Sequence, residues 1–290
     1  MRIVRHGCSK MAETVLVPLL VLLFSSSAVC KLDKNADTHG TLQLISENQF
    51  AEPGHKFWIG LRFTLEKGWH IYWLNPGDSG EPPKVNWELP AGFRAGELQW
   101  PAPHRLEHPP LTDFGYEDEV LLLAQVNPAA GLATGGGNTV LAADVEWVVC
   151  REVCIASHKR VTLPLAIERG APKVDPNWRV LFERTRAQLP KPAPLNWKST
   201  VLTEEKDFVL SIETGASEAN ATFFPLEELQ IEDAAPQRAS STRRGVRLTL
   251  EKSDQLLKPI KNLKGVIVLG NNRAYLIDAP VFHNKRGTSS

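Results

Sequence analysis

Short apolar, β-branched runs separated by turn-forming residues dominate residues 40–170. Dipeptides such as Pro53-Gly54 and Pro82-Pro83 stand between the runs, and no helical pattern interrupts them. About seven short strands in such an order predict an antiparallel β-sandwich of the immunoglobulin-like type. The strands are expected at 41–46, 56–65, 69–73, 85–89, 119–126, 139–149 and 161–167.

A different pattern begins at Asp175-Pro176. Asp175 suits the N-cap of a helix and Pro176 its first helical position. Apolar residues then recur at helical spacing over 178–189, until prolines at 190, 192 and 194 end the pattern. Residues 175–195 are therefore predicted to form a short helix that packs on the first module, followed by a semi-rigid, Pro-rich linker.

Strand patterns return in residues 196–283, which contain no cysteine and a single histidine, His283. Asn271-Asn272 is a tight-turn signal near the end of this segment. We expect a second, smaller β-sandwich without redox chemistry, serving as a scaffold or docking surface, so the fold class is all-β. Its strands are expected at 207–213, 221–224, 246–250, 265–269 and 274–277.

Residues 1–28 have the pattern of a secretory signal peptide. Three basic residues precede a short apolar run, which ends in Ser25-Ser26-Ser27-Ala28. The apolar run is too short to span a membrane. Export would place the mature chain in an oxidising compartment such as the periplasm, where disulfides persist. Cys30 raises the alternative of a lipid anchor, but Val29 stands where a lipidation motif requires a small residue.

Charge excludes one class of partner. Removing residues 1–28 takes away three basic residues and one acidic residue, which leaves 30 basic against 32 acidic residues and a net charge of −2. Nucleic-acid binding requires a basic surface, so it is not expected.

Two cysteines, Cys150 and Cys154, carry the strongest functional signal. The β-branched run before Cys150 predicts a strand, in which positions four apart lie roughly 13 Å from each other at about 3.3 Å per residue. A disulfide requires Cα atoms at about 5–6 Å. If the two cysteines are bonded, the chain must therefore turn at residues 151–153, as at the tip of a hairpin.

The size of the ring indicates what such a bond is for. Closing a ring of about five residues contributes roughly 2 kcal/mol, which makes a poor structural staple. A small ring is easier to reduce than a long-range bridge, which suits a bond that is made and broken. A purely structural hairpin disulfide stays an alternative. Basic residues nearby (Arg151, His158 and Lys159) favour the thiolate, whereas Glu146 and Glu152 oppose it.

Two aromatic stretches stand out beside the cysteines. The first, residues 68–80, packs aromatic residues around a turn and is expected to contribute mostly to the core. The second, residues 113–118, is flanked by prolines and charges. It is interpreted as a loop whose two exposed rings could cover a reactive disulfide.

Four motifs in order resemble the N-terminal periplasmic domain of the disulfide-bond reductase D (DsbD) family, in the branch of the copper-sensitivity suppressors. They are GWHIYWLNPGDSGEPP, LQWPAPHRL, DFGYEDEVLL and VEWVVCREVCI, and they cover most of residues 40–168. The resemblance implies an immunoglobulin-like sandwich (placed here at 40–170) that carries a redox cysteine pair on a hairpin.

The family also suggests roles for individual residues. Cys150 and Cys154 match its redox pair, and Cys154 would attack the partner disulfide. Phe114 and Tyr116, together with Asp113, match an aromatic cap loop that shields the pair. Tyr72 lies in the aromatic strand near the site, and His70 is also placed in the site surroundings.

Partners follow from the same resemblance. The domain would receive electrons from a thioredoxin-like donor and a membrane reductase, here on separate chains, and pass them to periplasmic disulfide-containing clients. This is exchange of the protein-disulfide reductase type, without a cofactor, in a family linked to cytochrome c biogenesis and copper tolerance. The sequence departs from the family in the short spacing of its cysteines and in lacking the membrane and thioredoxin-like domains.

Two other functions stay open. Cys150, Cys154 and His158 could bind copper(I) or zinc in a metal carrier, although their spacing is unusual for structural zinc. The mature chain has no methionine, which weighs against a thioether copper site. Alternatively, the chain is a non-catalytic adaptor or a carbohydrate-binding sandwich that uses surface tryptophans.

Overall fold

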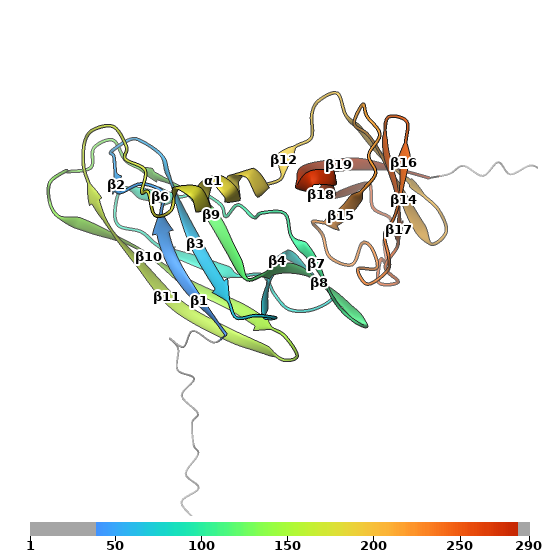
Figure 1. Cartoon of the computed structure of the whole chain (residues 1–290), viewed down its shortest axis with the longest axis horizontal. Coiled ribbons are helices and arrows are strands. Elements are labelled where there is room, and N and C mark those ends of the chain that lie inside the picture. The colour runs from blue at the N-terminus through green and yellow to red at the C-terminus, as the bar shows by residue number, and fades with distance from the viewer. Residues whose placement is uncertain (1–38, 284–290) are drawn as a thin grey trace, which may run out of the picture. The chain divides into compact units, whose positions relative to one another are not determined.

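The computed structural model describes residues 39–283, and the expected signal peptide and Cys30 lie outside them. The first body contains two β-sheets (Figure 1). The four-stranded sheet has the order β1 (Gly40–Ser46), β3 (Phe57–Leu65), β9 (Glu119–Pro128) and β6 (Phe93–Ala95). The seven-stranded sheet has the order β2 (Phe50–Ala51), β11 (Cys154–Ile167), β10 (Asn138–Cys150), β4 (His70–Gly77), β8 (Leu111–Glu117) and β7 (His104–His108), with β5 (Lys84–Glu88) paired to β10.

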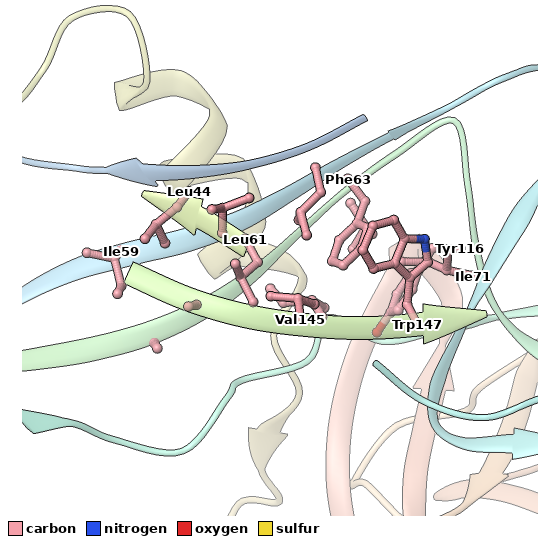
Figure 2. Packing of buried hydrophobic residues seen from close by; sticks show 14 of the residues in the cluster. Leu44, Ile59, Leu61, Phe63, Ile71, Tyr116, Val145 and Trp147 are labelled. Carbon is pink, nitrogen blue, oxygen red and sulfur yellow. The ribbon is translucent and has the colours of Figure 1, made fainter. Parts of the chain in front are cut away.

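Alternate residues of both sheets form one hydrophobic core, as period-2 strands require. Phe63 of β3 and Trp147 of β10 meet edge to face there, with ring centroids 5.7 Å apart. Figure 2 shows this pair together with Leu44, Leu61 and other core side chains. The first body is therefore an immunoglobulin-like sandwich, as the sequence predicts.

The same alternation gives the seven-stranded sheet two different faces. Ile71, Phe114 and Val149 belong to one buried hydrophobic cluster. Because successive side chains of a strand point to opposite faces, neighbouring residues such as Tyr72 and Cys150 lie on the outer face. The candidate chemistry is on this outer face.

One segment differs from its prediction. Residues 113–118 were expected to form a loop with exposed rings, but residues 111–117 form β8, between β4 and β7. Phe114 is fully buried and Tyr116 is 4 % exposed. The prediction of an exposed aromatic loop is therefore wrong. β8 is a strand whose aromatic residues alternate with Asp113 and Gly115.

The helix packs on the first body but begins later than predicted. α1 spans Arg179–Gln188, with Trp178 rather than Asp175 at its N-cap. Asp175 instead closes a turn, because its Oδ1 accepts the backbone N–H of Asn177 at 2.9 Å. Phe182 of α1 is fully buried in a cluster on the outer face of the four-stranded sheet, with Ile45, Leu121 and Leu123.

The segment after the helix also differs from the predicted linker. Lys191–Pro192 forms a short strand, β12, which pairs in parallel with β19 (Arg273–His283). The proline-rich stretch is thus partly incorporated into the second body.

The second body is one near-closed eight-stranded sheet around its own core. Its order is β15 (Ala221–Pro225), β18 (Asn262–Leu269), β19, β13 (Lys198–Thr203), β14 (Asp207–Glu213), β17 (Gly245–Glu251) and β16 (Arg238–Thr242), with β12 beside β19. Asn271 and Asn272 adopt positive φ angles of 61° and 55° between β18 and β19, where the sequence predicts a tight turn. The sequence patterns did not indicate β12, β13 or β16.

Candidate functional site

The two cysteines close the tip of the longest hairpin of the first body, formed by β10 and β11 (Figure 1). Cys150 ends β10 and Cys154 begins β11, and the two residues are register partners. They form a disulfide with their Cα atoms 4.2 Å apart. The chain turns at residues 151–153, where the N–H of Arg151 donates to the carbonyl oxygen of Val153 at 3.3 Å.

The two halves of the disulfide differ in exposure. Cys150 is only 2 % exposed, whereas Cys154 is an exposed residue. The neighbouring Val153 at the hairpin tip is 62 % exposed. A partner that approaches the tip can therefore reach Cys154 but not Cys150.

Trp69 anchors the hairpin tip. The guanidinium of Arg151 lies over the Trp69 ring, 5.3 Å from its centroid. Trp69 is 5 % exposed, and the His39 ring stacks on it at 3.7 Å. A cation–π contact of this kind contributes about 0.5–1 kcal/mol, which is enough to restrain a three-residue turn.

β4 supplies two side chains beside the disulfide. His70 is the register partner of Cys150, so the two side chains share the outer face of the sheet. Tyr72, two residues further on, points the same way, and its hydroxyl lies 3.5 Å from the Sγ atom of Cys154. Because a disulfide sulfur carries no proton, the tyrosine is the donor. Burial, together with the nearby Asp113 carboxylate, raises the pKa of Tyr72, so the hydroxyl stays protonated at neutral pH.

The turn after β4 covers Tyr72. Ser79 Oγ lies 3.3 Å from the Tyr72 hydroxyl and donates to Oδ1 of Asp113 at 2.9 Å. Gly80 has a φ of 75°, and a Cβ atom there would lie 2.0 Å from the Tyr72 ring. Glycine is thus required at this position, and the turn shields the tyrosine on the outer face of the sheet.

A second group of polar side chains continues from Asp113. Its Oδ2 lies 3.5 Å from His70 Nε2, and the His70 ring stacks on His108 with centroids 5.1 Å apart. Gly115 lets β8 approach β4 closely, because a Cβ atom there would lie 2.1 Å from the carbonyl oxygen of Ile71. Disulfide, tyrosine, serine, aspartate and two histidines thus form a continuous polar row beside the hairpin tip.

The structure separates the residues that the sequence suggested for a cap. Asp113 lies on the outer face with Tyr72 and His70. Phe114 and Tyr116 point into the core instead, and the Tyr116 hydroxyl donates to the carbonyl oxygen of Pro101 at 2.7 Å. Sequence reasoning missed Ser79 and His108. The GDSG turn directly after an aromatic strand was a signal for Ser79, whereas only the fold brings His108 to the site.

His158 does not share a site with the cysteines. β11 runs without interruption from Cys154 to Ile167, which places the Cα atom of His158 roughly 13 Å from that of Cys154. His158 Nε2 lies 3.4 Å from Asp144 Oδ1 instead. The three-residue metal set considered from the sequence is therefore not assembled.

Exposed tryptophans are lacking as well. Among the eight tryptophans, all of which the structure describes, each is buried or half-buried. A carbohydrate-binding surface built on exposed tryptophans therefore has no support.

Comparison with protein families decides the identity of the first body. Residues 41–166 match the family described as thiol:disulfide interchange protein DsbD, N-terminal. The first body is a DsbD N-terminal domain. The DsbD resemblance seen in the sequence is thereby confirmed. The family match covers every strand of the first body that carries a site residue.

A solved structure extends the likeness beyond the DsbD domain. The N-terminal periplasmic domain of ScsB from Proteus mirabilis has a TM-score of 0.64 and 15 % identity, covering 84 % of this chain and 94 % of its own. Identity this low shows a common fold alone. The aligned part is 84 % of this chain, which is longer than the DsbD match at residues 41–166. The common fold therefore includes the second body.

More distant structures add no argument. The periplasmic chaperone SfaE has a TM-score of 0.21 and 10 % identity, and covers 83 % of this chain and 99 % of its own. The tandem Ig repeats of Dlar have a TM-score of 0.23 and 13 % identity, and cover 85 % and 98 %. No curated protein matches the chain. Within residues 39–283, no helix is long and apolar enough to cross a membrane.

Proposed function

We propose that the chain is an exported thiol–disulfide interchange protein, which relays electrons through Cys150 and Cys154 to disulfide-containing proteins of the periplasm. The observation that carries the proposal is the disulfide at the hairpin tip, which joins an exposed cysteine to a buried one. The match of residues 41–166 to the DsbD N-terminal family implies thioredoxin-like redox partners.

The chemistry needs only the two sulfurs and a partner disulfide. In the reduced protein, the Cys154 thiolate attacks one sulfur of the partner disulfide. An S–S bond forms between the proteins, and a partner thiolate leaves. The Cys150 thiolate then attacks Sγ of Cys154 and releases the second partner thiolate. Two electrons pass to the partner, whose thiolates take up protons from water, and the Cys150–Cys154 disulfide is the product.

The surroundings of Cys154 support this role. The Tyr72 hydroxyl is 3.5 Å from the sulfur and stays protonated, so it can donate a hydrogen bond to a thiolate. Hydrogen bonds to charged groups are worth about 1.5–3 kcal/mol, more than those to neutral groups. The tyrosine thus favours the nucleophilic form of Cys154.

Completing the cycle requires a dithiol that reduces the disulfide again. A thioredoxin-like donor fits this step, because its thiolate can attack the exposed Cys154. We propose that the donor draws its own electrons from a membrane reductase. Roles in cytochrome c biogenesis or copper tolerance stay predictions from the family resemblance.

The redox potential of the pair tests the proposal. The protein is equilibrated in glutathione or dithiothreitol buffers, and its free thiols are alkylated and counted. Exchange proteins lie between about −270 and −120 mV, so we expect a value in this interval. A potential below about −300 mV identifies an inert structural bridge, which would rule out the relay.

Single-cysteine variants test which sulfur reacts. Cys150→Ser leaves the exposed Cys154 and should form a mixed disulfide with oxidised glutathione quickly. Cys154→Ser leaves the buried Cys150 and should react far more slowly. The double variant is the control for disulfides formed elsewhere. Equal rates in the two single variants would contradict the assigned order of attack.

A further inference from the structure

Three side chains with metal-binding atoms converge on the outer face of the first body. They are His70 of β4, His108 of β7 and Asp113 of β8. One ligand atom from each lies within 4.8 Å of those of the other two. β7 and β8 form a hairpin and β8 pairs with β4, so adjacent strands of one sheet hold the group.

The buried ring of His70 lacks hydrogen-bond partners in the protein. The residue is 1 % exposed, and neither of its ring nitrogens has a hydrogen-bond partner. Although Nε2 lies 3.5 Å from Asp113 Oδ2, the geometry does not make a hydrogen bond. A buried polar group without a partner costs about 1–3 kcal/mol. A ligand that accepted the lone pair of one ring nitrogen would satisfy that nitrogen and reduce the cost.

Asp113 is oriented so that one of its carboxylate oxygens could bind a metal ion beside His70. The residue is 3 % exposed, and its Oδ1 accepts a hydrogen bond from Ser79 Oγ at 2.9 Å. The other oxygen, Oδ2, faces His70. A carboxylate that is oriented through one oxygen and offers the other is typical of a metal ligand with outer-sphere support.

We propose that His70, His108 and Asp113 bind one divalent transition-metal ion of the zinc type. Two imidazoles and one carboxylate are a donor set that zinc and its first-row neighbours accept, whereas calcium and magnesium prefer oxygen ligands alone. Three protein ligands leave one position of a tetrahedral ion open to water or another small ligand.

Metal binding brings the three ligand atoms closer together. Two atoms that each lie about 2.1 Å from Zn²⁺ are at most about 4.2 Å apart, so any pair with a separation between this distance and the 4.8 Å limit must move closer. His108 is exposed, and its side chain can move, whereas His70 and Asp113 are fixed by burial. We therefore expect His108 to close onto a preformed pair.

The site contains no sulfur ligand, although it lies near the redox pair. His70 is the register partner of Cys150, and its ring meets that of Tyr72 edge to face with centroids 5.2 Å apart. Because no thiolate takes part, the ion should bind while the Cys150–Cys154 disulfide is intact. This distinguishes the site from a cysteine metal carrier, and its failure would leave the proposed exchange untouched.

The test is a calorimetric titration of the oxidised full chain with Zn²⁺, in a buffer free of phosphate and chelators. We expect one ion per chain. His108→Ala should weaken the affinity at least about tenfold, because even the loss of a supporting residue behind a metal ligand costs about 10–100-fold. As His108 is exposed, this variant should fold. Asp113→Asn keeps an acceptor for Ser79 but removes the charge, and should also weaken binding.

His104→Ala is the matched control. His104 is an exposed histidine on the same strand, roughly 13 Å from His108 at four residues' distance. Its removal should leave the affinity unchanged. The proposal is overturned if the oxidised chain binds no Zn²⁺, if His108→Ala binds as tightly as the natural protein, or if His104→Ala loses as much affinity.

Discussion

The hydroxyl of Tyr72 lies 3.5 Å from the Sγ atom of Cys154, although 82 positions separate the two residues in the sequence. The contact exists because β4 lies beside the end of β10, so that the aromatic strand borders the hairpin tip. Tyr72 is itself fully buried beneath the turn at residues 77–80. A protonated donor is thereby held against the sulfur that partners can reach.

Tyr72→Phe should slow the reaction of Cys154. In a Cys150→Ser background, the rate of alkylation at pH 7 should fall about tenfold, because the thiolate loses a hydrogen bond worth about 1.5–3 kcal/mol. The measurement is the rate of iodoacetamide labelling. Tyr275→Phe in the second body is the control. An unchanged rate in Tyr72→Phe would show that the hydroxyl does not act on the sulfur.

Gly80→Ala should destabilise the first body by at least about 2 kcal/mol. Its Cβ atom would clash with the Tyr72 ring, and its φ of 75° is unfavourable for alanine. Urea unfolding measures the loss. Gly131→Ala is the matched control, because a Cβ atom there meets nothing within 4 Å. Similar stabilities for the two variants would show that the turn does not hold the tyrosine.

Reducing the disulfide should leave the protein folded. A ring of about five residues contributes only about 2 kcal/mol, and the β10–β11 ladder continues along the whole hairpin. We expect the unfolding free energy in urea to fall by no more than this amount on reduction. The double variant Cys150→Ser, Cys154→Ser should not respond to the reductant. Unfolding of the natural protein on reduction would indicate a structural staple.

Asp233 should make stability decrease as the pH rises. The residue is 5 % exposed, its Oδ1 has no hydrogen-bond partner, and burial raises its pKa to about 7. The unfolded chain has an ordinary aspartate pKa of about 3.9. Between these values the folded state holds a proton that the unfolded state has released. The unfolding free energy therefore falls as the pH rises from about 4 to 7, and the full cost is present above pH 7.

Asp233→Asn removes this titration. Its stability in urea should exceed that of the natural protein at pH 8, and the advantage should shrink as the pH approaches 4. Asp254→Asn, at an exposed position, should leave the pH profile unchanged. A constant difference between Asp233→Asn and the natural protein at all pH values would contradict the raised pKa.

Phe182→Ala should show that α1 belongs to the first body. Phe182 is fully buried against the four-stranded sheet, and such a truncation costs about 3–5 kcal/mol. Val180, two residues earlier, is 66 % exposed, and Val180→Ala should change stability by less than about 0.5 kcal/mol. Calorimetric melting of both variants measures the difference. A small effect for Phe182→Ala would mean that the helix is only loosely attached.

The hairpin was predictable because it follows from covalent geometry. Cysteines four positions apart in an extended chain can bond only across a turn, and the strand pattern before Cys150 placed that turn at residues 151–153. The first sandwich was predictable from its turn residues and period-2 runs. These signals are local, so one sequence contains them in full.

β8 was not predictable for a physical reason. Its aromatic residues alternate with Asp113 and Gly115. A sequence-based prediction assigns an aspartate in such a segment to a loop, because the hydrogen-bond partner that allows its burial is not visible in the local sequence. That partner, Ser79, comes from a different segment, and His108 joins the group only through the fold. The start of α1 was misplaced because Asp175 makes a turn with Asn177. The Asp-Pro pattern therefore marks the turn that precedes the helix and not its first residue.

The unequal exposure of Cys150 and Cys154 sets the kinetic order of the proposed relay. An electron donor and a client would have to use the same sulfur, so the two proteins cannot be joined to the hairpin simultaneously. Turnover would then alternate between two half-reactions, and each partner would compete with the other for the free hairpin. Steady-state rates measured with both partners should follow a ping-pong scheme, with parallel double-reciprocal plots and inhibition by an excess of either partner.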